Sequence, residues 1–272
     1  MHNHLIQSRA LLEQVALEGA RGVYVGDDTV LCRVLGIYHS YVDGRDVSVA
    51  QHLIMNGYWE SWITLAMARA LQPGMRAVDV GANLGYFSLL MADAVGPQGK
   101  VLAFEPQERY AGLVGRSLRA NGFHVQAEVR QQAVSSEKGS LDLLVPEDFF
   151  GSASVAASFE DYSTTSTTVE AVTLDEALAD WESVDLIKID VEGAEYAVWQ
   201  GMADVRRRSP DLAIVLEFNA SSYDDPQGFL DEVRGEGFAT YEIATDGGLA
   251  PFVDAEVVSR ADFSMLWLSR ED

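Results

Sequence analysis

VDVGANLGYF, residues 78–87, is the stretch that decides which fold this chain is expected to adopt. Its first residues are apolar, as in a buried strand, and the chain then passes through Gly81 and Gly85 into a predicted helix. Glycines at such a turn allow a sharp bend and let a ligand approach the backbone closely. The unpaired amides at the start of the following helix add partial positive charge. The stretch therefore predicts a nucleotide-like ligand at a strand-to-helix turn.

The residues around this turn distinguish between two kinds of ligand. A dinucleotide site has the pattern G-x-G-x-x-G, whereas this chain has Asn83 between its two glycines and the bulky Phe87 after them. Asp79, just before the turn, would repel a pyrophosphate and would suit the ammonium of an amino acid. S-adenosylmethionine has such an ammonium and no phosphate, so it is the predicted cofactor. Two alternatives stay open: a nicotinamide-dependent oxidoreductase, and a catalytically silent module that only binds the cofactor.

Segments typical of strands and helices alternate along the rest of the chain. Apolar residues spaced as on one helix face predict a helix over residues 59–70. Further strands are expected at residues 101–104, 129–134, 141–145, 186–189, 212–218, 238–243 and 263–268. The alternation predicts an α/β fold, doubly wound and Rossmann-like, with a mostly parallel seven-stranded sheet. Turn signals at Asp246-Gly247-Gly248 lie between the last two strands, which are expected to form an antiparallel C-terminal hairpin.

The first part of the chain has a different pattern. Residues 23–48 resemble short strands joined by turns and predict a small β element. We therefore divide the chain into residues 1–58, with an N-terminal helix and this β element, and residues 59–272, the main domain. The Ser/Thr/Ala-rich loop of residues 146–168 and the β element are the candidates for a lid over the acceptor.

A second group of polar residues follows the strand at 186–189. In a doubly wound sheet this strand lies beside the first one, so Asp190 would face the Gly81 turn across the crevice where ligands bind. Glu217 and Asn219 end the next strand on the same rim. Three interpretations stay open. Asp190 can act as a base or position an acceptor hydroxyl; Asp190 and Glu217, with Asn219, can hold a divalent cation such as Mg²⁺; or both carboxylates are structural.

Other positions are expected to contact the cofactor because of their place at strand ends. Glu105 ends the second strand, where an acidic side chain can accept hydrogen bonds from both ribose hydroxyls. Gln132 ends the third strand, beside the expected adenine. Trp59-Glu60 precedes the first helix of the main domain and either contacts the methionine end of the cofactor or caps the helix.

Composition limits the partners and the compartment. The chain has 42 acidic and 19 basic residues among 272, a formal net charge of −23. Because this charge repels nucleic-acid phosphates and anionic membrane surfaces, we predict a small-molecule or glycan acceptor and no nucleic acid. Cys32 is the only cysteine, which excludes an intrachain disulfide. Without an apolar run of ~18 residues or the pattern of a secretory signal, we expect a cytoplasmic protein with no membrane insertion, and a homo-oligomer is compatible with these features.

Several segments together resemble the FkbM family of methyltransferases. They are GYWESW (57–62), LQPGMRAVDVGANLGYFSLLMA (71–92), VLAFEP (101–106), VTLDEAL (172–178) and DLIKIDVEGAEYAVWQGM (185–202). The resemblance implies a class I methyltransferase fold for residues 59–272. It also implies transfer from S-adenosylmethionine to a hydroxyl oxygen, typically on a sugar or secondary metabolite. By match to the family's motifs, the cofactor site would be lined by Gly81, Asn83, Gly85, Glu105 and Asp190.

Overall fold

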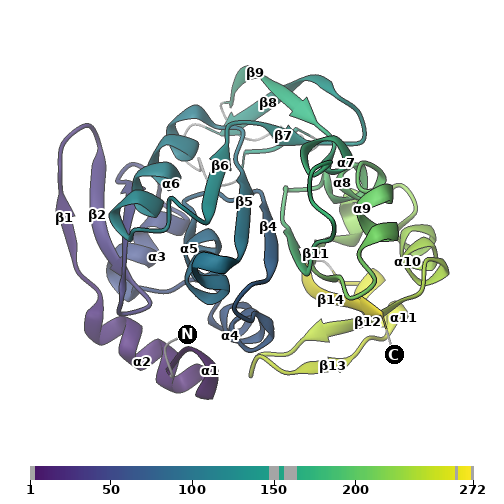
Figure 1. The fold of residues 1–272 in the computed structure, drawn as a ribbon, viewed down its shortest axis with the longest axis horizontal. Helices are drawn as coiled ribbons and strands as arrows, with labels where there is room; N and C mark the ends of the chain where they lie inside the picture. The colour runs from purple at the N-terminus through teal and green to yellow at the C-terminus, as the bar shows by residue number, and fades with distance from the viewer. Residues whose placement is uncertain (1–3, 147–152, 156–163, 261–262, 271–272) are drawn as a thin grey trace.

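A twisted central sheet organises the computed structural model, which describes residues 4–146, 153–155, 164–260 and 263–270 (Figure 1). Among these residues the sheet has eight strands. In spatial order they are β13 (Leu249–Pro251), β12 (Phe238–Ile243), β14 (Ser264–Arg270), β11 (Ala213–Phe218), β10 (Leu186–Ile189), β4 (Arg76–Val80), β5 (Lys100–Phe104) and β6 (Ala127–Arg130). The four pairs from β11 to β6 are parallel, whereas β14 and β12 run antiparallel to their neighbours. The predicted doubly wound, mostly parallel α/β fold is confirmed.

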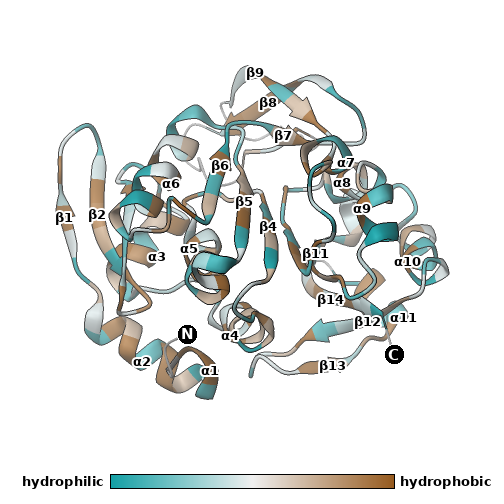
Figure 2. Ribbon diagram, in the orientation of Figure 1, coloured by the Kyte–Doolittle hydropathy of each residue, from teal (hydrophilic) through white to brown (hydrophobic). Residues whose placement is uncertain are grey.

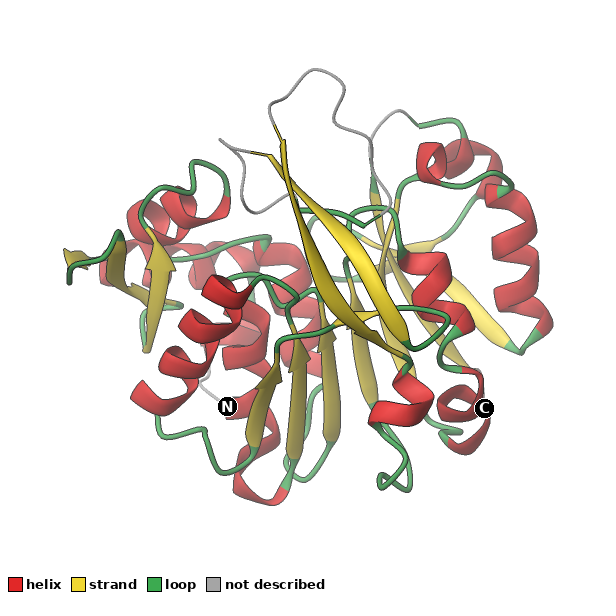
Figure 3. Cartoon of the chain, turned by 90° about the horizontal axis from the view of Figure 1, so that it is seen from above, coloured by secondary structure: helices red, strands yellow, loops and turns green. Residues whose placement is uncertain are grey.

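Helices cover both faces of the sheet, as the view from above shows (Figure 3). Residue alternation along the strands explains the two layers: in β4, Ala77 belongs to one apolar cluster, while Val78 and Val80 belong to the other. The first cluster packs α4 (Ser61–Ala70), α5 (Tyr86–Val95) and α6 (Glu108–Ala120) on the sheet. The second packs α8 (Glu195–Gln200), α9 (Ala203–Arg208) and α10 (Pro226–Gly235). Strand β11, buried between these layers, is mostly hydrophobic along its length (Figure 2).

The C-terminal strands are arranged differently from the predicted hairpin in one respect. β12 and β14 are antiparallel neighbours as expected, but the turn at Asp246–Gly248 joins β12 to the short extra strand β13. Helix α11 (Asp254–Val258) then precedes β14, which inserts between β11 and β12. Burial explains this order, because five consecutive residues of β14 are buried whereas β13 is an exposed edge.

The strand predicted at residues 129–134 is broken in two. β6 ends at Arg130, and β7 (Ala133–Val134) joins β8 (Gly139–Pro146) and β9 (Thr164–Val172) in a separate three-stranded sheet. In Figure 3 the long β8–β9 pair crosses in front of the central sheet. Part of the predicted loop at 146–168 is therefore strand β9. Residues 147–152 and 156–163 of that loop lie outside the described residues. Helix α7 (Leu174–Ala177) begins after β9 with Thr173 as its N-cap, whose side chain accepts a hydrogen bond from the Glu176 amide.

The N-terminal segment packs against the first helix layer. It contains α1 (His4–Gln7), α2 (Arg9–Gly19), the predicted small sheet of β1 (Gly22–Tyr24), β2 (Thr29–Val34) and β3 (Tyr38–Asp43), and α3 (Val49–Asn56). The Tyr38 hydroxyl donates a hydrogen bond to the Asp93 carboxylate at 2.9 Å. The Asn121 side chain accepts a hydrogen bond from the backbone amide of His39 and donates one to its carbonyl oxygen. One apolar cluster runs across the predicted boundary at residues 58/59, and that boundary stays a prediction. Within the described residues, no helix combines the length and the apolar character needed to cross a membrane.

Candidate functional site

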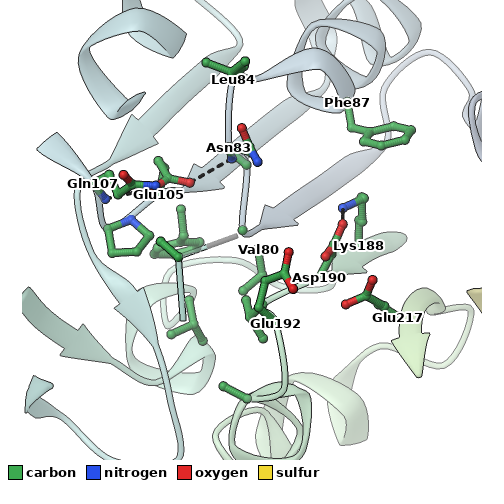
Figure 4. Close-up of a pocket in the computed structure, with 18 of the residues that line it drawn as sticks. Val80, Asn83, Leu84, Phe87, Glu105, Gln107, Lys188, Asp190, Glu192 and Glu217 are labelled. Carbon is green, nitrogen blue, oxygen red and sulfur yellow. Dashed lines mark hydrogen bonds and ion pairs between the residues drawn. The ribbon is translucent and has the colours of Figure 1, made fainter. Parts of the chain in front are cut away.

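A cavity of about 310 Å³ lies at the carboxyl ends of β4, β5, β10 and β11. This is the topological switch point of a doubly wound sheet, where ligands bind, and its size falls within the range of small-molecule sites. Figure 4 shows two groups of polar side chains in it. Glu105 lies near Asn83 on one side, and Lys188, Asp190, Glu192 and Glu217 gather on the other.

The turn after β4 requires its glycines for two different contacts. Gly81 has a φ of +81°, and a Cβ there would lie 1.8 Å from the carbonyl oxygen of Asp190. The missing side chain thus lets the turn after β4 touch the end of β10. Gly85, the N-cap of α5, has a φ of +76°, and its missing Cβ makes room for Val114 of α6. Gly81 and Asn83 line the cavity, whereas Gly85 is not among the described residues that line it. The predicted contact of these three residues with a cofactor stays a prediction.

Glu105 is held at the end of β5 by two backbone amides. Its Oε2 accepts from the Asn83 amide at 2.8 Å and its Oε1 from the Gln107 amide at 2.9 Å. The side chain is 4% exposed, and burial raises its pKa to about 8. Because each carboxylate oxygen has a second lone pair, Glu105 can still accept hydrogen bonds from a ligand in the cavity. Gln132 lines the same cavity from the break between β6 and β7.

Asp79 is a buried residue of β4. It is 1% exposed, accepts from the Ser88 hydroxyl at 2.5 Å, and is not among the described cavity-lining residues. The strand register places it opposite Lys188 of β10, and burial raises its pKa. Its predicted contact with a ligand ammonium stays a prediction.

A buried ion pair joins this region to the cavity. Lys188 is 2% exposed and its Nζ donates to Asp190 Oδ2 at 2.6 Å, with the Phe87 ring centroid 4.9 Å away. Burial opposes the charge of Lys188, but the carboxylates of Asp190, Asp79 and Glu60 outweigh it and raise its pKa. Lys188 is therefore a cation, and it holds Asp190 at the cavity wall.

Glu217, predicted beside Asp190, lines the cavity from β11. Burial, followed by the charges of Asp190, Glu192 and Glu195, raises its pKa to about 10, so it is protonated at neutral pH in the free protein. Asn219 is not among the described residues that line the cavity. Its Oδ1 accepts hydrogen bonds from the amide and the hydroxyl of Ser221 at 3.1 and 2.7 Å. Within the described part of the chain, no three His, Cys, Asp or Glu side chains are grouped to hold a metal ion. The predicted Mg²⁺ site thus gains no support.

Two glutamates complete the acidic side of the cavity. Glu60 precedes α4 with a φ of +37°; its side chain makes no capping hydrogen bond and lines the cavity. Glu192, after β10, has a φ of +55° and lines it too. Burial and the nearby Asp190 raise the pKa of both to about 7. The sequence prediction considered Glu60 only as an alternative and missed Glu192; the signal available was the Glu192-Gly193 turn. We call Glu60, Asp190, Glu192 and Glu217 the carboxyl cluster.

Described residues of the loop predicted as a lid, 146–168, reach this site. Ala153 and Val155 of that loop line the cavity, together with Leu143 of β8. The Ser154 hydroxyl donates to the Glu192 carbonyl at 2.7 Å. The sheet that carries the loop is therefore tied to the backbone of the carboxyl cluster.

Comparison with known proteins adds independent information. Residues 79–239, more than half of the chain, match the sequence profile of the methyltransferase FkbM domain. Methyltransferase sdnD of Sordaria araneosa is 32% identical over 154 residues, which cover 46% of this chain and 59% of that protein. The chain thus spans less than two thirds of this relative's length.

Solved structures with a similar arrangement are more distant. Methyltransferase FkbM from Methylobacillus flagellatus KT is 14% identical with a TM-score of 0.44, over 72% of this chain and 43% of that one. Precorrin-6y C5,15-methyltransferase from Geobacter metallireducens GS-15 is 14% identical with a TM-score of 0.47, over 85% of this chain and 97% of that one.

Proposed function

The chain belongs to the FkbM methyltransferase family, and from this premise we propose that it transfers a methyl group from S-adenosylmethionine to a hydroxyl of a small molecule or glycan. One observation carries the proposal: Glu105 and the carboxyl cluster lie on opposite sides of one cavity at the switch point of the sheet. A ligand that spans this cavity meets an acceptor of hydroxyl hydrogen bonds on one side and an acidic wall on the other.

The residues present fit S-adenosylmethionine better than a dinucleotide. Glu105 can accept from ribose hydroxyls, and Gln132 lies where the adenine is expected. The carboxyl groups that line the cavity would repel a pyrophosphate. Lys188 is the one cation among the described lining residues, and it is already paired with Asp190. The donor carries no phosphate and has a positively charged sulfur, so the acidic wall favours it.

The carboxyl cluster contains groups that can position the acceptor hydroxyl and accept its proton. When bound, S-adenosylmethionine supplies a methyl group on a sulfonium; in the transfer the sulfur keeps the bonding electron pair and the acceptor oxygen forms the new bond. The hydroxyl must be aligned and must lose its proton. Asp190, fixed by Lys188, can orient the hydroxyl or act as the base that accepts its proton, the role that the sequence predicts for it.

The net charge of the chain and the contacts of its polar residues indicate which partners and metals to expect. A net charge of −23 opposes binding to nucleic acid, which favours a small-molecule or glycan acceptor. Asp190 is paired with Lys188, and the Asn219 side chain is hydrogen-bonded to Ser221, so neither is free to bind a metal ion. We therefore expect turnover that is unchanged by a chelator and by added Mg²⁺.

Calorimetry with S-adenosylmethionine, S-adenosylhomocysteine and NAD⁺ tests the proposed function. We expect saturable binding of the first two and none of NAD⁺. Turnover is then followed as release of S-adenosylhomocysteine over a panel of hydroxylated sugars and secondary metabolites. Saturable NAD⁺ binding would favour an oxidoreductase, and cofactor binding without turnover over the whole panel would favour a silent binding module.

A further inference from the structure

The charges that line the cavity are strongly unbalanced. Five carboxyl groups face it, from Glu105 and the four members of the carboxyl cluster, whereas Lys188 is the one cation among its described lining residues. Both carboxyl oxygens of Glu105 accept hydrogen bonds from backbone amides, those of Asn83 and Gln107. Among the described residues, Lys188 forms an ion pair with Asp190 and with no other carboxylate. The remaining glutamates of the cluster are therefore not neutralised by side chains of the wall.

Glu60 shows this most directly. Its Oε2 is buried and has no hydrogen-bond partner among the described residues. The residue itself is fixed, because its carbonyl oxygen accepts from the Thr64 amide at 3.0 Å in the first turn of α4. A buried carboxylate oxygen without a partner is costly. The backbone thus holds an unsatisfied oxygen at the wall of a cavity that is large enough for a ligand.

Charged groups from several elements face Glu60 and Glu192. Around Glu60, burial, Asp190 and Glu192 favour protonation, whereas Lys188 of β10 and a hydrogen bond from the Trp59 side chain oppose it. Around Glu192, burial, Asp190 and Glu195 of α8 favour protonation, and Lys188 again opposes it. Glu217 of β11 faces Asp190, Glu192 and Glu195, and Asp79 of β4 lies opposite Lys188 in the strand register. The balance leaves Glu60 and Glu192 with pKa values of about 7, so these groups change protonation state near neutral pH.

We propose that the carboxyl cluster is a cation site for the positively charged sulfur of the methyl donor, and that the cluster exchanges a proton for that charge. The inference rests on the proposed function and assigns roles to Glu60 and Glu192. Binding of the positive donor lowers the proton affinity of the nearby carboxyl groups, so a proton leaves to solvent. When the methyl moves to the acceptor oxygen the sulfur becomes neutral, and the cluster again favours protonation. The proton given up by the acceptor hydroxyl is then retained by a carboxylate of the cluster.

Two commercially available ligands isolate the charge on sulfur. S-adenosylmethionine and S-adenosylhomocysteine share the adenosine, the ammonium and the carboxylate, and differ in the methyl and its positive charge. Calorimetry at pH 7 in phosphate and in Tris, whose ionisation enthalpies differ, gives the number of protons released per ligand bound. We expect about half a proton or more for S-adenosylmethionine, from groups with a pKa of about 7, and about zero for S-adenosylhomocysteine. Equal proton release for the two ligands would overturn the inference.

Variants locate the effect. Glu60→Gln should reduce the proton release and lower the affinity for S-adenosylmethionine about tenfold, while the affinity for S-adenosylhomocysteine is retained and shows that the variant is folded. Glu192→Gln should act in the same direction. Glu18→Gln, which removes an exposed carboxylate of α2, is the matched control and should change neither affinity. An equal loss for both ligands in Glu60→Gln would contradict the cation site, whereas a wild-type protein that binds neither ligand would refute the proposed function itself.

Discussion

In the proposed function, Glu105 is the residue that accepts hydrogen bonds from the ribose hydroxyls. Replacing it by glutamine keeps the shape but exchanges one acceptor oxygen for an amide group that only donates, so the bond from the Asn83 amide or from a ligand hydroxyl is lost. Since leaving a buried hydrogen-bonding partner unsatisfied costs about 1–3 kcal/mol, we expect Glu105→Gln to weaken binding about 10- to 100-fold. The loss should be the same for S-adenosylmethionine and S-adenosylhomocysteine in calorimetry, because both contain the ribose. Glu128→Gln, an exposed position on β6, serves as the control, and a loss confined to one ligand would contradict this role.

Lys188 balances carboxylates on two strands. Lys188→Met leaves Asp79 and Asp190 without their buried cation, which typically costs about 3–5 kcal/mol in the free energy of unfolding. Asp79→Asn added to Lys188→Met removes one of the uncompensated charges, so the double variant should recover at least ~1 kcal/mol of that loss. Chemical denaturation of the wild type, both single variants and the double variant measures the coupling. Strictly additive effects would show that Asp79 and Lys188 do not interact.

At the scale of elements, the contact between the turn after β4 and the end of β10 shapes the cavity. Gly81→Ala would put a Cβ 1.8 Å from the Asp190 carbonyl oxygen and force the two segments apart. We expect binding of S-adenosylhomocysteine to fall at least 100-fold. Gly74→Ala is a matched control, because Gly74 also has a positive φ, +90°, but nothing lies within 4 Å of the added Cβ. Similar binding by both variants in calorimetry would show that the close contact is dispensable.

Elements with strong local patterns were predictable from the sequence, and those that depend on distant partners were not. The apolar strand and glycine turn at residues 78–87 identify β4 and α5 without reference to other segments. The break between β6 and β7 depends on a second sheet, whose strands β8 and β9 come later in the chain. Similarly, the position of β14 between β11 and β12 follows from burial in the assembled sheet.

The candidate site divides in the same way. Gly81, Asn83, Glu105 and Asp190 follow or end strands in the sequence, and all four line the cavity, while their contact with a cofactor stays a prediction. Glu192 looks like an ordinary turn residue in the sequence. Its positive φ, its burial and its raised pKa arise only when β10, α8 and β11 are packed together.

For the whole molecule, the carboxyl cluster links stability to pH. Burial raises the pKa of Glu60 and Glu192 to about 7 and that of Glu217 to about 10, from an ordinary value of 4.5. The folded state therefore holds more protons than the unfolded state over this range. The stability these groups contribute is complete below pH 4.5 and is lost as pH rises through the folded pKa values. Each extra proton held corresponds to about 1.4 kcal/mol lost per pH unit. We expect the free energy of unfolding of the ligand-free protein to fall between pH 5 and pH 9.

The overall charge of −23 contributes to the same trend, and two comparisons separate the causes. Repulsion among surface charges is screened by salt, whereas buried groups are screened much less, so the slope due to the cluster should persist in 0.5 M NaCl. Glu217→Gln removes the group with the widest titration gap and should flatten the slope by about 1 kcal/mol per pH unit. Glu18→Gln should leave the slope unchanged.

Asp43 titrates outside this pH range. Its burial is outweighed by hydrogen bonds from Arg45 and Arg109, which lower its pKa to about 2. The stability that Asp43 contributes is therefore lost only below about pH 4 and does not affect the slope between pH 5 and pH 9. Chemical denaturation from pH 5 to pH 9 measures these slopes, and equal slopes for Glu217→Gln and the wild type would mean that Glu217 is ionised in the folded protein.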